Sequence, residues 1–251
     1  MILITKLKNL TVDDINTIVK ITGTVNTRHI GGYKGHDGRI TDELAFIRSD
    51  VPHSITCEDM KFLLERGIET VLDFRTQEEV DGTPVPFDEI AEFSYVMIPL
   101  ISDETPPHLM KNTSLGSLYV HILEDRKNQI AEALRMINRT NGGVFFNCSA
   151  GKDRTGIMAM ILLMLAGVDK QDVITDYYFT EILLEPWIKE VVPKLEAQGS
   201  KVDVKMFEAL PEYIEKAIDH IEENYGTIEN YVKSIGLSDE EIKKLVEKVL
   251  K

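Results

Sequence analysis

The stretch VFFNCSAGKDRTGIMAMILLM, residues 144–164, places the strongest constraint on what this chain can fold into. It follows the turn signal Asn-Gly-Gly, and its opening apolar run, VFF, predicts a buried strand. From about Thr155 to Gly167 the residues are again largely apolar, over a length typical of a helix. Between these two elements stand a cysteine, several small residues and three charges, which a core element does not need. The stretch therefore predicts a strand, a functional loop and a helix in succession.

Strand and helix patterns also alternate along the chain before this stretch. Thr56 and Asp59 form a capping box at the start of one predicted helix. The predicted elements are helices at 56–67 and 117–138 and strands at 70–74 and 93–100. This alternation predicts an α/β fold with a mostly parallel central sheet flanked by helices.

The remainder of the chain, from about Gln171 onward, carries helical patterns only. Ser238 and Glu241 form a capping box for a terminal helix. We expect residues 1–251 to form a single domain with extra C-terminal helices. Its expected parts are a core at about 20–181, a helical appendage or lid at about 182–225, and helices at 226–251. We interpret Trp187, in the appendage, as a core residue, with a place in the lid as the alternative.

The net charge of −14 limits the partners of the chain. It opposes binding to nucleic acid phosphates and to anionic lipid surfaces, so an anionic ligand must be captured locally. The longest nearly apolar run, residues 156–168, is far shorter than the roughly 20 residues of a membrane-spanning helix, and we read no secretory signal at the start. Two cysteines, Cys57 and Cys148, make no disulfide framework. We therefore expect a soluble, cytoplasmic protein, with an exported form as the alternative.

The loop that begins at Cys148 has the composition of an anion site that also carries a nucleophile. The end of a strand and the start of the next helix offer backbone N–H groups and a positive dipole end. Gly151 permits a close backbone approach, and Arg154 can donate two hydrogen bonds to one phosphate. The same groups stabilise a thiolate on Cys148, to which Thr155 can donate its hydroxyl. The alternative is a buried structural cysteine beside a solvated helix start.

The segment NCSAGKDRTG, residues 147–156, resembles the signature of cysteine-dependent protein tyrosine phosphatases. It is most similar to the H-C-x-x-G-K-D-R-T-G form of the bacterial tyrosine/serine, dual-specificity and lipid phosphatase-like group. Similar segments follow the family's order: residues 26–40, 44–50, 56–79 and 176–180, and the C-terminal end. Asn147 departs from the family pattern, because histidine usually precedes the nucleophile there. An asparagine can still hydrogen-bond to the backbone and order the loop.

The resemblance implies a tyrosine phosphatase-like fold and a CX5R phosphate loop that works without metal or cofactor. Cys148 would attack phosphorus and Arg154 would hold its oxygens, giving a phosphocysteine that water hydrolyses. The general acid would be Asp153, with Asp103 in the loop after the 93–100 strand as the alternative. The implied phosphate-binding residues are Ser149, Ala150, Gly151, Lys152, Asp153 and Arg154, and the supporting residues are Asn147, Thr155, Asp73 and Arg75.

The implied partners are phosphorylated proteins or phosphoinositides, with inorganic phosphate and related oxyanions as inhibitors. Phosphotyrosine is the leading substrate, and phosphoserine, phosphothreonine, phosphoinositides and inositol phosphates are alternatives. Lys152 is interpreted either as a contact to a further phosphate at the rim of the site or as charge balance. Asp73 and Arg75 are interpreted first as a structural ion pair. A phosphate-binding module without turnover is the alternative from another functional class.

Overall fold

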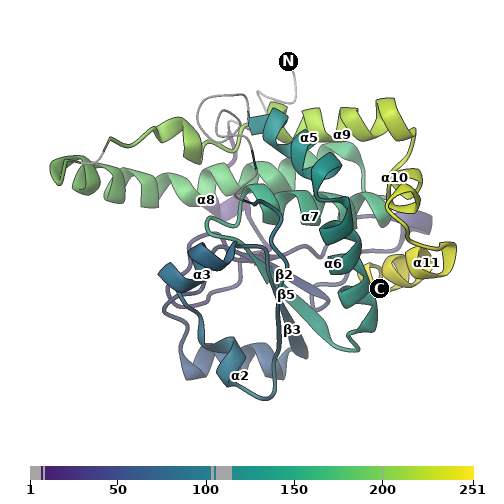
Figure 1. Ribbon diagram of the computed structural model, residues 1–251, viewed down its shortest axis with the longest axis horizontal. Helices are drawn as coiled ribbons and strands as arrows, with labels where there is room; N and C mark the ends of the chain where they lie inside the picture. Colours follow the sequence, from purple (N-terminus) through teal and green to yellow (C-terminus); the bar gives the residue numbers. More distant parts are fainter. Residues whose placement is uncertain (1–6, 8, 103–104, 106–114, 200) are drawn as a thin grey trace.

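The computed structural model describes residues 7, 9–102, 105, 115–199 and 201–251, and Figure 1 shows their arrangement. A central sheet is flanked by helices, and most helices lie on one side of it. The strands are β1 (Arg28–His29), β2 (Phe46–Ser49), β3 (Ile68–Asp73), β4 (Ser94–Met97) and β5 (Gly143–Asn147). The longer helices are α2 (Cys57–Glu65), α5 (Leu115–Asp125), α6 (Lys127–Arg139), α7 (Asp153–Leu165), α8 (Lys170–Ala197), α9 (Pro211–Tyr225) and α11 (Asp239–Val249). The shorter ones are α3 (Gln77–Gly82), α10 (Ile228–Ser234), η1 (Val12–Asp14), η2 (His36–Gly38), η3 (Pro86–Glu89) and η4 (Val204–Phe207).

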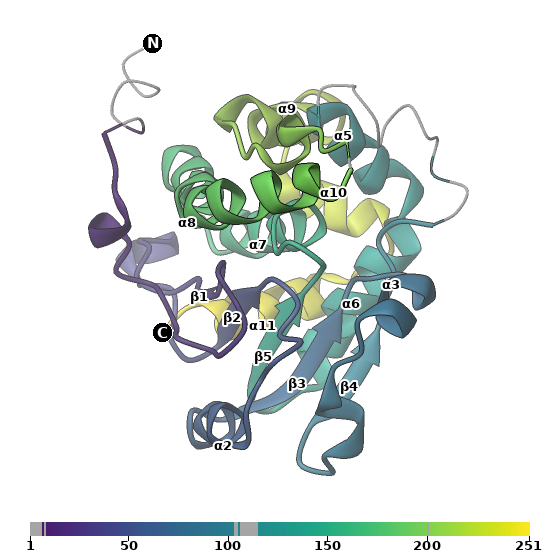
Figure 2. The ribbon, with the colours of Figure 1, turned by 90° about the vertical axis from the view of Figure 1, so that its left-hand side faces the viewer.

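The sheet has the strand order β1-β2-β5-β3-β4, visible edge to edge in Figure 2. The pairs β2–β5, β5–β3 and β3–β4 are parallel, and only the edge pair β1–β2 is antiparallel. The predicted α/β class with a mostly parallel central sheet is confirmed. The sequence pattern does not predict β1 and β2, because β1 has two residues and β2 is buried along its whole length, so neither shows a period-two pattern.

Alternate residues of the strands build two separate cores. Phe46, Leu72 and Phe146 pack against the large helical layer that contains α5, α6, α7, α9 and α11. On the opposite face, Ile47 and Phe145 join the smaller core that includes residues of α2 and η3. The parallel strands thus have both faces covered, which is typical of an α/β fold. Helix α7 is buried nearly all round, so its start is held firmly at the end of β5.

The predicted helix at 117–138 is wrong in one respect, because the chain forms two helices there. The break falls at Arg126, whose backbone φ of −108° and ψ of 24° lie outside the helical range. Helix α5 packs mainly on α9, whereas α6 packs on α11, so the two segments follow different partners. The predicted capping boxes at Thr56–Asp59 and Ser238–Glu241 are confirmed.

Helix α8 extends beyond the body of the molecule. Its first half carries most of the buried residues, including Tyr177 and Phe179. Its second half contains Pro193 and projects as an arm on the left of Figure 1, from which the chain returns through η4. The role of residues 182–225 as a lid stays a prediction. None of the described helices is both long enough and apolar enough to cross a bilayer.

Candidate active site

Residues 148–152 form the loop between β5 and α7, at the carboxyl ends of the parallel strands. Cys148 is the first residue after β5 and is only 1% exposed. Gly151 has a φ of +64°, and a Cβ atom there would lie 2.4 Å from the Asp50 amide nitrogen. Only glycine therefore fits this position without displacing the β2 end. The loop lies where open α/β sheets bind their ligands.

The carbonyl groups of residues 149–151 are turned away from the loop interior and bound from outside. They accept hydrogen bonds from the Val51 amide (3.2 Å), the Asn26 side chain (3.0 and 3.1 Å) and the Arg48 guanidinium (2.9 Å). Across the described residues, the amides of 149–152 donate to no recorded acceptor. Successive backbone N–H groups in a loop of this kind form an anion-binding concavity, so these donors are suited to an anion.

A buried ion cluster holds these outer donors in place. The Asp176 carboxylate on α8 accepts from Arg28 Nε at 3.1 Å and forms a second, short ion pair with Arg48. Arg28 also donates to Asn26 Oδ1 at 2.5 Å. Burial raises the pKa of Asp176, but the two guanidinium groups outweigh burial and lower it, so the carboxylate stays ionised. Burial, with the neighbouring Arg48, lowers the pKa of Arg28 to about 10.

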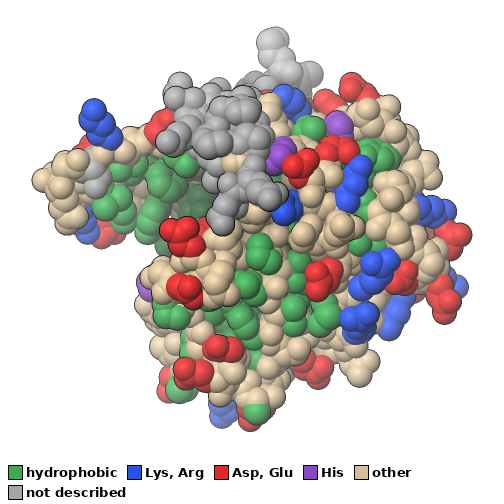
Figure 3. Space-filling view, viewed as in Figure 1, with side chains coloured by type: hydrophobic (Ala, Val, Ile, Leu, Met, Phe, Trp, Pro, Cys, Tyr) green, Lys and Arg blue, Asp and Glu red, His purple; other side chains and the backbone are tan. Residues whose placement is uncertain are grey.

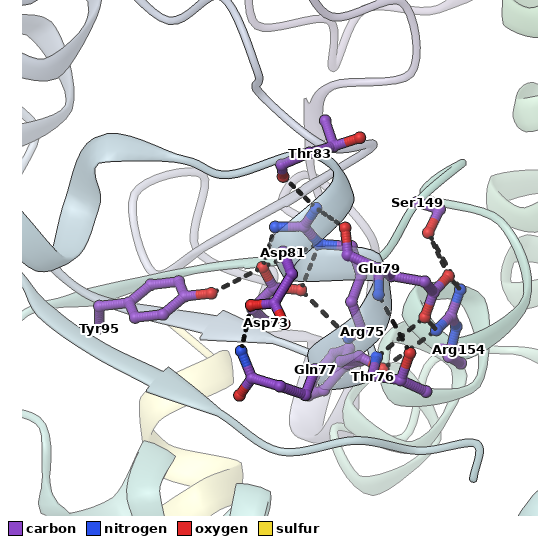
Figure 4. A network of polar contacts seen from close by, with 11 residues as sticks. Asp73, Arg75, Thr76, Gln77, Glu79, Asp81, Thr83, Tyr95, Ser149 and Arg154 are labelled. Atoms are coloured by element: carbon purple, nitrogen blue, oxygen red, sulfur yellow. Dashed lines mark hydrogen bonds and ion pairs between the residues drawn. The ribbon is translucent and has the colours of Figure 1, made fainter. Parts of the chain in front are cut away.

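The Arg154 guanidinium, near the start of α7, is held by Glu79 in a bidentate ion pair, drawn in Figure 4. Its Nη1 and Nη2 atoms lie 2.6 and 2.8 Å from the two carboxylate oxygens, and Nη2 lies 3.2 Å from Ser149 Oγ. Arg154 Nε is buried and has no hydrogen-bond partner among the described residues. Burial lowers the pKa of Arg154, but the Glu79 hydrogen bonds and the charge of Cys148 more than offset it, so the arginine remains charged.

Glu79 is a site residue that the sequence interpretation missed. Burial raises its pKa, yet Arg154 outweighs burial and lowers it to about 2. Because the pKa of Glu79 is lower in the folded protein than in the unfolded chain, the ion pair adds to the free energy of unfolding above pH ~4.5. This stabilisation is lost as the pH falls toward 2. The only local signal was a capping box with Thr76, whose amide donates to Glu79 at 2.9 Å. That signal indicates a helix start and says nothing of Arg154.

Asp73 and Arg75 form a buried ion pair beside this network (Figure 4). Arg75 Nη2 lies 2.6 Å from Asp73 Oδ2, and Arg75 Nη1 donates to the Thr83 carbonyl at 2.6 Å. Tyr95 donates its hydroxyl to the same Asp73 carboxylate at 3.0 Å. These contacts connect the end of β3 to the C-terminal end of α3, the helix that carries Glu79. Asp73 and Arg75 therefore position the partner of Arg154.

Asp153, the first residue of α7, lies beside a pair of buried tyrosines. The Tyr119 hydroxyl donates to Asp153 Oδ1 at 2.7 Å and also forms a short hydrogen bond with the Tyr177 hydroxyl. Burial raises the pKa of Tyr119 well above its ordinary value, so it remains a donor. The Asp153 side chain is 23% exposed. Its carboxyl group is thus oriented by Tyr119 and by the Lys152 ammonium, and it is still open to solvent.

Lys152 forms an ion pair with Asp153, with 3.5 Å between its Nζ atom and Asp153 Oδ1, which agrees with its interpretation as charge balance. Its side chain is 1% exposed, and its ammonium donates to the backbone carbonyls of Met206 (2.5 Å) and Glu208 (3.1 Å). It lies neither at the rim of the loop nor in solvent, because the return of the chain through η4 covers it. Contacts more than fifty residues apart in sequence produce this arrangement, which no local pattern encodes.

Two expected hydrogen bonds are not formed. Thr155 Oγ1 is buried and bonds to no described residue, so it does not donate to Cys148. Both polar atoms of the Asn147 side chain are also buried without a described partner. The expectation that Asn147 orders the loop through the backbone is therefore wrong, and Asn26, Arg48 and Val51 carry out that function instead. Asp103, the alternative acid, lies outside the described residues.

These features define an α/β protein whose loop between a parallel strand and a buried helix presents backbone N–H donors. The chain belongs to the tyrosine phosphatase family, whose sequence model matches residues 19–251. It is 31% identical over 215 residues to a tyrosine-protein phosphatase of Nostoc commune, covering 80% of this chain and 72% of that protein. A putative tyrosine-protein phosphatase of Cupriavidus necator is 26% identical, covering 83% and 80% of the two chains. A triple specificity protein phosphatase of Mycobacterium tuberculosis is 24% identical, covering 41% and 42%. The family resemblance is thereby confirmed.

Proposed function

We propose that this protein hydrolyses phosphotyrosine through a phosphocysteine intermediate on Cys148. The observation that carries the proposal is that hydrogen-bond donors of the loop have no acceptor. The carbonyls of residues 149–151 are bound from outside, while the loop amides and Arg154 Nε have no acceptor among the described residues. A tetrahedral dianion would satisfy these donors together. Membership of the tyrosine phosphatase family supports the same substrate chemistry.

The first step forms a bond from Cys148 sulfur to phosphorus and breaks the bond from phosphorus to the tyrosine oxygen. Negative charge on the equatorial oxygens is stabilised by the loop amides and by Arg154, which needs no reorganisation because Glu79 already holds it. Asp153 protonates the departing phenolate oxygen. Water then attacks phosphorus, Asp153 accepts its proton, and the sulfur leaves as a thiolate. Inorganic phosphate is released, and the chain's own residues supply every proton transfer.

The Lys152 geometry favours a protein substrate over a phosphoinositide. A lysine at the rim would contact a second phosphate on an inositol ring, but the Lys152 ammonium already donates to the carbonyls of Met206 and Glu208. Phosphoserine and phosphothreonine remain additional proposed substrates, and the Mycobacterium tuberculosis relative is named a triple specificity protein phosphatase. We propose phosphotyrosine as the preferred one.

The purified protein is expected to hydrolyse para-nitrophenyl phosphate and a phosphotyrosine peptide in the presence of a metal chelator. Without the chelator, which itself binds vanadate, vanadate should inhibit both reactions competitively, because it occupies the donors prepared for phosphate. Release of inorganic phosphate measures turnover, and calorimetry measures oxyanion binding. Binding without turnover would contradict the enzyme proposal and leave a phosphate-binding module. Turnover that stops with the chelator would contradict metal independence.

Asp153→Asn should lower kcat for the phosphotyrosine peptide on the order of 10²-fold, because the phenolate then leaves unprotonated. The loss should be smaller with para-nitrophenyl phosphate, whose leaving group is less basic. Rates of phosphate release from the two substrates give the comparison. Asp88→Asn, on the exposed surface of η3, is the matched control. If Asp103→Asn shows this leaving-group dependence and Asp153→Asn does not, the acid is Asp103.

A further inference from the structure

A cavity of about 350 Å³ adjoins the phosphate loop at the base of α8. Its size is at the lower end of the range for ligand pockets, roughly 300–1,000 Å³, which suits one side chain better than an extended ligand. Figure 3 shows the surface indented below the arm, with hydrophobic side chains along the arm itself. The apolar lining consists of Val25, Val51, Ala150, Leu184, Trp187 and Phe207.

The cavity lies beside the phosphate site and is not its floor. Of the described loop residues, only Ala150 is part of the lining, and neither Cys148 nor Arg154 is. A group bonded directly to the phosphorus would contact the loop around Cys148. The cavity is therefore placed for a neighbouring part of the substrate.

An aromatic pair forms the wall of the cavity on the side of α8. Trp187 of α8 and Phe207 of η4 meet edge to face, with ring centroids 5.6 Å apart and planes at 65°. Lys152 donates to the carbonyls of the residues on either side of Phe207, so the phosphate loop itself fixes this wall. Lys152 is thus a positioning residue that connects the loop to the cavity.

The one carboxylate in the lining is already bound by backbone groups. Asp50 accepts from the amides of Val25 (3.0 and 3.3 Å) and Asn26 (3.0 Å), and its residue is mostly buried. The carboxylate therefore adds little free charge to the cavity. An apolar occupant gains from burial against the aromatic pair, whereas a charged one would lose hydration there and could turn only to His53, the other ionisable side chain of the lining.

We propose that this cavity is a specificity pocket for an apolar side chain that neighbours the phosphorylated residue of a peptide substrate. The inference rests on the proposed function and names the substrate feature that the site selects. The cavity adjoins the phosphate loop at Ala150, so its occupant must lie next to the phosphorylated residue. Its aromatic wall favours an apolar side chain.

The test compares phosphotyrosine peptides whose flanking residues are all alanine with peptides carrying one phenylalanine at one flanking position at a time. In the native protein, one flanking position should raise kcat/KM about 10-fold, mainly through KM. Trp187→Ala and Phe207→Leu should each remove most of that advantage. Phe62→Ala, on a partly exposed aromatic residue of α2, should leave it unchanged. Thermal unfolding confirms that each variant is folded.

The same peptides are bound to the Cys148→Ser protein, so that the preference is also measured without turnover. A preference in binding with no hydrolysis by the native protein contradicts the proposed function and supports the pocket. Hydrolysis of every peptide with no preferred flanking position overturns the pocket. An equal loss for alanine and phenylalanine peptides in Trp187→Ala also overturns it, because the cavity would then hold the phosphotyrosine ring or act only on the fold.

Discussion

Cys148→Ser will lower the hydrolysis of phosphotyrosine on the order of 10³-fold or more. The helix start and Arg154 can stabilise a thiolate, but a serine hydroxyl is far less acidic and remains a weak nucleophile in the same place. The oxygen is also a poorer leaving group when water attacks the covalent intermediate. Phosphate release under saturating substrate measures the loss, and a burst of one phenolate per protein in the native enzyme identifies the intermediate.

The chain supplies its own control for this substitution. Cys57, the only other cysteine, is exposed at the start of α2, so Cys57→Ser should retain native activity. Cys148→Ser should still bind vanadate or phosphate, because Arg154 and the loop amides are untouched. Residual hydrolysis near the native rate would show that Cys148 is not the nucleophile. Loss of oxyanion binding as well would show that the substitution disrupts the loop.

The strand, loop and helix around Cys148 could be predicted because each is encoded by adjacent residues. The apolar run of β5, Gly151 at a positive φ and the apolar helix α7 are local properties. Burial of α7 on nearly every side then determines where the loop must lie. The central α/β architecture follows from the same kind of pattern, repeated along the chain.

The residues that hold the loop could not be predicted, because each is distant from it in sequence and ordinary in its own neighbourhood. Glu79 lies 75 residues before Arg154, and its local role is a helix cap. Arg48 belongs to a strand too buried to show alternation, and Asp176 lies 128 residues after it. Their roles exist only once the sheet brings β2, β5 and α8 together.

Trp187 shows the same limit for the substrate side of the site. As one apolar residue on a helix, it was interpreted as core, yet it is half-buried and lines the cavity beside Ala150. Its partner Phe207 reaches it only because the chain turns back after α8. A sequence pattern identifies Trp187 as apolar but does not show which surface the side chain faces.

Asp176→Asn will destabilise the fold by about 3–5 kcal/mol, because it leaves Arg28 and Arg48 as buried cations without their shared anion. For a chain of this size that corresponds to a fall in Tm of roughly 6–20 °C. The asparagine keeps the shape of the side chain, so the change isolates the charge. Calorimetric unfolding at neutral pH measures the loss.

The exposed carboxylate of Asp219 provides the comparison. It lies 2.6 Å from Lys170, but its side chain is 53% exposed, so Asp219→Asn should change stability by less than about 1 kcal/mol. Asp176→Asn should also weaken vanadate binding at temperatures where the protein is folded. Arg48 donates to the Gly151 carbonyl, and Arg28 holds Asn26, which donates to the Ala150 and Gly151 carbonyls. Equal, small effects of the two substitutions would contradict this role. If stability falls strongly while vanadate affinity stays native, the ion cluster stabilises the fold but is not needed to hold the phosphate loop.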